Sequence, residues 1–261
     1  MVAVLTRQYA NVAGLALIVY DQALTWDKEV KCIWRSSERG IKLSFFLARY
    51  LATNLVYTHP HILKRGWVGC HTWFGFQTSG IGLLLINLEL TLMLRVYALY
   101  ERSLKIKVIL ASWFIFSLGM SAFIGGRSIH VLKLDSNCIM TETPETTTTF
   151  SVMVMLDQCV LWGLTCYKYR DAIRNGWSKN PIMRLVMRDN TWTCIGICCL
   201  FIAVLPYSLV VEQIGHIMYC LLCSLLSITT CRMILNMRSL EPPSRSEGPE
   251  FTTGFDEMAM S

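Results

Sequence analysis

Long runs of apolar residues alternate with short polar segments along this 261-residue chain. The strongest run lies within residues 74–106, where residues 81–100 supply the roughly twenty apolar positions that cross a bilayer's hydrocarbon core. The pattern predicts an all-α integral membrane bundle of seven transmembrane helices, at residues 9–26, 43–58, 81–100, 106–124, 150–167, 191–211 and 214–236.

Composition agrees with several membrane spans rather than one anchor. Only 16% of the residues are charged and 53% are hydrophobic, whereas a soluble domain carries about 25% charged residues. The net charge of +6 could suggest nucleic acid, but the excess lies in the short segments between apolar runs. There, Lys and Arg set membrane topology, so we expect a lipid bilayer and no nucleic acid as partner.

The distribution of basic residues predicts the orientation. With the N-terminus outside, 18 of the 24 Lys and Arg residues fall in inner segments and five in outer segments. This asymmetry follows the positive-inside rule and puts the C-terminus in the cytosol. Most charge follows the first run rather than preceding it, which favours a retained helix over a signal peptide. We therefore expect the plasma membrane or a secretory-pathway membrane.

Two regions follow from this reading. Residues 1–236 form the seven-helix transmembrane domain. Residues 237–261 are rich in Pro, Ser and acidic residues without periodicity, which predicts a disordered cytosolic tail.

Cys70 and Cys138 are the two cysteines in the predicted outer loops. Cysteines that face an oxidising compartment commonly pair. A disulfide would tie the loop before residue 150 to the top of the third helix. The alternative is two free thiols.

Asp21 and Arg49 lie toward the inner halves of the first two predicted helices. Opposite charges on adjacent helices reduce each other's desolvation cost. We predict a structural ion pair between them. The alternative is a proton or ion relay, because intramembrane charges are candidates for function.

Four further polar residues could line a ligand cavity: Asn87, Glu89, Asp157 and Glu212. If their helices surround one space, the acids could receive a cationic or polyhydroxy ligand. The alternative is ordinary interhelical hydrogen bonding, which is common in membrane bundles.

Enzymatic and metal-binding signatures are absent from the sequence. No Walker loop, nucleophile elbow or HExxH motif occurs, so no enzymatic activity is predicted. The pairs Cys198–Cys199 and Cys220-x-x-Cys223 lie in apolar runs, where cysteine behaves as a small hydrophobe. A structural zinc site needs a closed set of four ligands, and we predict neither a metal nor a cofactor.

Several motifs match a known pattern. Residues 20–30 read YDQALTWDKEV, residues 46–51 read FLARYL, residues 94–100 read LRVYALY, and residues 231–238 read CRMILNMR. They resemble a large family of multi-pass membrane proteins from mushroom-forming fungi, catalogued as a domain of unknown function, whose signature would occupy about residues 9–51. The resemblance implies a membrane location and no established activity.

Three functions remain open at this level. The first is a receptor-like sensor that couples a small-molecule ligand outside to a cytosolic partner at the basic inner segments. The second is a transporter or channel for a small solute. The third is a scaffold for other membrane proteins.

Overall fold

The computed structural model describes residues 2–34, 38–57, 67–131, 145–174, 181–210 and 214–239, and these residues form helices and short turns without a strand. The elements are α1 (Val2–Glu29), η1 (Val30–Trp34), α2 (Arg39–Phe46), η2 (Leu47–Leu51), α3 (Ala52–Tyr57), α5 (Trp67–Leu99), α6 (Leu104–Val131), α7 (Glu145–Arg174), α8 (Pro181–Val210) and α9 (Ile214–Arg238). Both η1 and η2 are π-helical. The tail beyond residue 239 lies outside the described residues.

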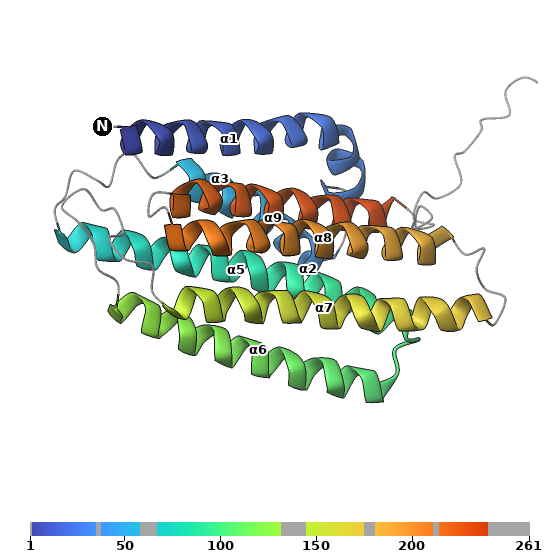
Figure 1. The fold of residues 1–261 in the computed structure, drawn as a ribbon. Helices are drawn as coiled ribbons and strands as arrows, with labels where there is room; N and C mark the ends of the chain where they lie inside the picture. Colours follow the sequence, from blue (N-terminus) through green and yellow to red (C-terminus); the bar gives the residue numbers. More distant parts are fainter. Residues whose placement is uncertain are drawn as a thin grey trace, which may run out of the picture.

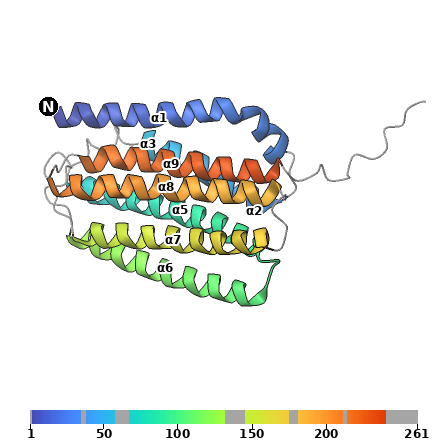
Figure 2. The ribbon, with the colours of Figure 1, turned by 45° about the vertical axis from the view of Figure 1, so that its right-hand side comes forward.

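The helices lie lengthwise in one bundle (Figure 1). Helix α1 covers one side and packs on α9 and α3, while α6 and α7 form the opposite side. Between them lie α5, α8 and α9, and α9 contacts α1, α5 and α8. From α5 to α9 successive helices run in opposite directions along the bundle, and α1 runs in the same direction as α5 (Figures 1 and 2), so the C-terminal ends of α1, α5, α7 and α9 lie at the same end.

Within the part of the chain that the structure describes, five helices are long and apolar enough to cross a membrane. Their spans are Phe74–Leu99, Leu104–Ser128, Thr146–Arg174, Met183–Ala203 and Tyr219–Arg238. These confirm five of the seven predicted spans. The described part of α1 is not among them. The second predicted span falls on α2, η2 and α3, which have eight, five and six residues and so are each too short to cross a membrane alone.

The interior and the surface are both apolar, as expected of a bundle in lipid. Leu55, Leu84, Leu88 and Leu226 are nearly inaccessible in the main core cluster. The outer faces expose large apolar side chains, including Ile115 and others on α6. A monomer in water rarely exposes so much apolar surface.

Helices α7 and α8 extend further into the basic segment between them than the apolar pattern predicts. Helix α7 continues to Arg174, and α8 begins at Pro181, ten residues before the predicted start at Thr191. Proline suits the first turn of a helix, since its missing N–H would have no partner there. Asp189, predicted to lie in a basic loop, is therefore on α8.

Gly14 determines how closely α1 approaches α9. A Cβ atom there would lie 3.1 Å from Ser224 Oγ and 3.4 Å from Cys220 Cβ. Ser224 also donates a hydrogen bond to the Gly14 carbonyl, with an Oγ–O distance of 3.0 Å. A larger side chain at this position must push the two helices apart.

We therefore expect Gly14→Leu to lower stability by about 1–3 kcal/mol, the usual cost of overpacking. Thermal unfolding in detergent micelles measures the effect. Gly82→Leu is the matched control, because a Cβ at Gly82 meets nothing within 4 Å. Equal melting temperatures for the two variants would contradict close α1–α9 packing.

Candidate functional site

Three residues of α1 place polar groups on one buried face. Asp21, Thr25 and Glu29 are spaced four residues apart, so they lie on the same side of the helix. Their exposed fractions are 4%, 8% and 0%. The Thr25 hydroxyl donates to the Asp21 carbonyl over 2.8 Å. This face therefore needs polar or cationic partners from neighbouring helices.

Arg49 supplies one such partner from η2. Its Nη1 lies 3.6 Å from Glu29 Oε2, and the two side chains are 2% and 0% exposed. A second nitrogen, Nη2, donates to Thr25 Oγ1 over 3.0 Å. The guanidinium also lies over the Phe45 ring, 5.5 Å from its centroid. π-helical turns are frequent at functional sites, and Arg49 lies within one.

Arg232 of α9 supplies the partner of Asp21. Its Nε lies 2.6 Å from Asp21 Oδ1 and donates a charge-assisted hydrogen bond. The Asp21 side chain is 5% exposed, whereas that of Arg232 is 54% exposed. The structure thus corrects the predicted Asp21–Arg49 ion pair, because Asp21 pairs with Arg232 and Arg49 pairs with Glu29. Thr25 lies between the two pairs: its hydroxyl accepts from Arg49 and donates to the Asp21 carbonyl.

A second charged group links α5, α8 and α9. Arg95 donates a hydrogen bond to the Met233 carbonyl, and its Nη1 lies 3.5 Å from Asp189 Oδ2. Asn236 donates to the same Asp189 oxygen over 3.1 Å. The Arg95 and Asp189 side chains are 3% and 10% exposed. Arg188 reaches the other Asp189 oxygen at 3.5 Å from a mostly exposed position.

Both groups meet on the same stretch of α9, residues 231–236, which we call the C-terminal α9 segment. Arg232 bonds to Asp21 of α1. The Met233 carbonyl accepts from Arg95 of α5, and Asn236 donates to Asp189 of α8. Cys231 lies against Arg49. Its apolar side chains pack with Ile33, Phe45 and Ala48 from η1, α2 and η2. About one and a half turns of α9 therefore contact α1, α5 and α8 as well as η1, α2 and η2, all at one end of the bundle.

A separate acidic group lies between α5, α6 and α7. Asp157 accepts hydrogen bonds from Trp113 Nε1 over 3.1 Å and from Ser117 Oγ over 2.7 Å. Glu89 is close enough to interact with both Asp157 and Ser117. Glu89 is 8% exposed, and its Oε1 has no hydrogen-bond partner among the described residues. Two acids thus lie near one buried hydroxyl, which donates to Asp157.

The four predicted cavity residues do not all come together. Glu89 and Asp157 meet, but Asn87 faces α2, where it accepts from Ser44 Oγ over 2.7 Å and donates to the Ser44 carbonyl over 2.9 Å. Asn87 and Glu89 are two residues apart, so the helix turns them to different sides. Glu212 lies outside the described residues.

A cavity of about 380 Å³ borders this region without including the acids. It lies between α6 and α7 and is lined mainly by apolar side chains, including Trp113 and Val160. The ligand cavity therefore remains a prediction. The predicted Cys70–Cys138 disulfide also stays untested, since the Cys70 side chain and all of Cys138 lie outside the described part of the chain.

Sequence reasoning missed several members of these groups. Glu29 and Asp189 both fall outside the predicted spans, since the first span ends at residue 26 and the sixth begins at residue 191. The helical spacing of Asp21, Thr25 and Glu29 was the available signal for the first. For Asp189, the signal was its position only two residues before Thr191, where the apolar run begins.

Comparison with known proteins adds one finding. Residues 9–53 match the profile of a family of unknown function, DUF6533. The matched region contains Asp21, Glu29 and Arg49. No curated protein and no solved structure shows a significant match to the chain.

Proposed function

We propose that the chain crosses the membrane seven times, with the N-terminus outside and the C-terminus in the cytosol. Helix α1 and the segment 39–57 would add two spans to the five apolar ones. Their charges support this reading, because Asp21, Glu29 and Arg49 point into the bundle and have partners there. The basic residues at the ends of α5, α7 and α9 would then face the cytosol.

Epitope tags test this topology. In intact cells, an antibody should reach a tag placed before Met1 and should not reach one placed after Ser261 until the membrane is permeabilised. If the tag after Ser261 is reachable from outside intact cells, the orientation is reversed and the proposal fails.

Within this topology we propose a non-catalytic, receptor-like sensor. The observation that carries it is the C-terminal α9 segment, where buried charged groups from α1, α5 and α8 converge. Buried ion pairs can specify one arrangement of helices over others. A small molecule bound nearer the outer end would favour a second arrangement, in which these bonds are broken and the basic inner segments engage a cytosolic partner.

A sensor requires the two ends of the bundle to be coupled, and coupling is reciprocal. Breaking the bonds at the C-terminal α9 segment must therefore alter the outer end even without a ligand. Hydrogen–deuterium exchange of the full chain in lipid nanodiscs measures both ends. We expect Asp189→Asn to raise exchange at the inner ends of α8 and α9 and also in the outer half of α5.

Arg188→Gln is the matched control for this experiment. It removes a neighbouring charge that is mostly exposed, so neither end should change. If Asp189→Asn raises exchange at the inner end alone, the ends are independent and the sensor proposal is contradicted.

The acidic group favours a second candidate, a proton-coupled transporter. Ionisable residues inside a bundle often mark proton pathways, and Glu89 and Asp157 lie close enough to interact beside the Ser117 hydroxyl. Proteoliposomes that contain a pH-sensitive dye test this candidate. Proton flux in the wild-type chain that Glu89→Gln abolishes would favour the transporter over the sensor, whereas the sensor predicts no flux from either protein.

A further inference from the structure

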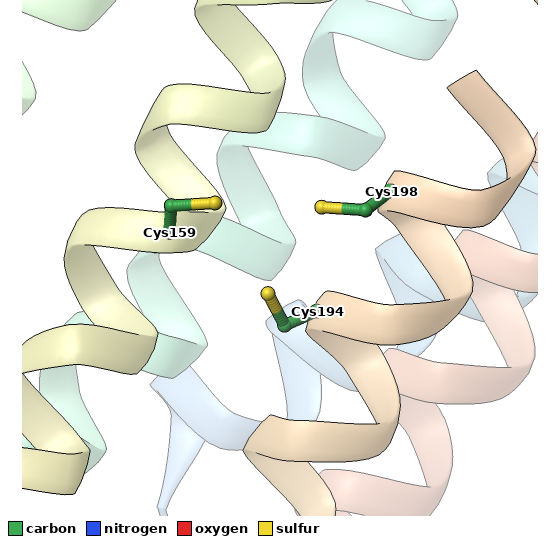
Figure 3. Close-up of side chains that lie close together, drawn as sticks. All are labelled: Cys159, Cys194 and Cys198. Carbon is green, nitrogen blue, oxygen red and sulfur yellow. The ribbon is translucent and has the colours of Figure 1, made fainter. Parts of the chain in front are cut away.

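Three cysteines meet between α7 and α8. Cys159 is on α7, and Cys194 and Cys198 are on α8; their three Sγ atoms all lie within 4.8 Å of one another. Figure 3 shows the three sulfurs pointing toward one another across the gap between the helices. All three thiols are free. None of the bonds at the C-terminal α9 segment or at the acidic group involves them.

Sequence spacing and packing explain this arrangement. Cys194 and Cys198 are four residues apart, so they lie on one face of α8. Beside them, Trp162 of α7 donates to Thr191 Oγ1 of α8 over 3.1 Å. These two residues lie three positions from Cys159 and Cys194 respectively, so this bond fixes the register of α7 and α8 next to the thiols. The sulfurs are thus held close by the packing of two long helices.

The composition of the cluster restricts the ligand. Three sulfur atoms, with no His nitrogen or carboxylate oxygen joining them among the described residues, suit a soft metal ion, since thiolates select ions such as Cu(I). Structural zinc requires four ligands, and the cluster offers three. Mg²⁺ and Ca²⁺ require oxygen ligands.

The net charge of the metal-bound cluster also favours a monovalent ion. The cysteines lie within the spans Thr146–Arg174 and Met183–Ala203, where an uncompensated charge is costly. One monovalent ion that replaces one thiol proton leaves the cluster neutral. Zn²⁺ would need two thiolates for neutrality and would still lack its fourth ligand.

We propose that Cys159, Cys194 and Cys198 form a binding site for a monovalent soft metal ion, Cu(I), between α7 and α8. Binding proceeds by thiol exchange: a Cu–S bond to a donor thiolate breaks, a Cu–S bond to a cysteine forms, and the cysteine proton leaves on the donor thiol. The copper remains Cu(I) throughout, so no oxidant or reductant is needed.

The test is an anaerobic Cu(I) titration of the reduced full-length chain in detergent micelles, with bicinchoninate as competing chelator. The wild-type chain should hold one more Cu(I) against the competitor than the variant Cys159→Ser/Cys194→Ser/Cys198→Ser. The control Cys166→Ser/Cys199→Ser should keep that ion, because it changes one cysteine on each of the same two helices outside the cluster. Equal binding by the triple variant and the wild-type chain, or loss of the ion from the control, would overturn the site.

A second measurement uses only the wild-type chain and so does not depend on how the variants fold. The chain is treated with a membrane-permeable maleimide with and without Cu(I), and the modified cysteines are mapped by mass spectrometry. Cu(I) should lower modification of Cys159, Cys194 and Cys198 at least tenfold and leave Cys166 and Cys199 unchanged. Uniform protection, or none at the three cysteines, would contradict the proposal.

Discussion

Arg49→Leu should lower the stability of the bundle by about 3–5 kcal/mol, the usual cost of removing one member of a buried ion pair. The substitution leaves the Glu29 carboxylate 0% exposed and without its cation. It also removes the hydrogen bond that Thr25 accepts from Arg49. Thermal or chemical unfolding in detergent micelles, followed by tryptophan fluorescence, measures the loss.

Two further variants distinguish the ion pair from general damage to η2. Arg49→Leu/Glu29→Gln should recover much of the loss, because it removes the uncompensated charge. Arg39→Leu should change little, since Arg39 is an exposed cation at the start of the same segment. A double variant no more stable than the single one would show that burial of the Glu29 charge is not the cause.

Asp189→Asn should cost about 1.5–3 kcal/mol, the range for a hydrogen bond to a charged group. Arg95 keeps its bond to the Met233 carbonyl but loses the opposite charge at 3.5 Å while remaining 3% exposed. The same unfolding experiment measures the change, and Arg188→Gln should shift stability by less than about 0.5 kcal/mol, as mostly exposed pairs usually do. Equal effects of the two substitutions would mean that the buried contact contributes nothing beyond surface charge.

The apolar pattern predicted the helical class and five spans because lipid-crossing helices need long apolar runs, which are visible in the sequence. It placed helix ends poorly where charged residues continue a helix beyond the apolar run. Glu29 and Asp189 were assigned to loops for this reason. Both lie on helices: Glu29 is fully buried and Asp189 half-buried, each beside an arginine from a distant part of the chain.

The cation that pairs with a buried acid was harder to predict from the sequence than the position of the acid in its helix. The sequence correctly indicated that Asp21 needs a cation, but Arg49 and Arg232 are both basic residues near the same depth. Arg232 is 211 positions away, and only the packing of α1 on α9 decides between them. The three-cysteine cluster shows the same limit: the spacing of Cys194 and Cys198 is visible in the sequence, whereas Cys159 joins them only through the packing of α7 on α8.

The C-terminal α9 segment holds the ends of α5 and α8 together through Met233 and Asn236. Pulsed electron paramagnetic resonance tests it directly, with spin labels on non-natural ketone-bearing residues at positions 101 and 184, which avoids labelling the eleven native cysteines. Glu101 and Arg184 are both exposed at this end of the bundle. We expect one narrow distance distribution in the wild-type chain and in Arg188→Gln, and a longer or broader one in Asp189→Asn. An unchanged distribution in Asp189→Asn would contradict this role of the C-terminal α9 segment.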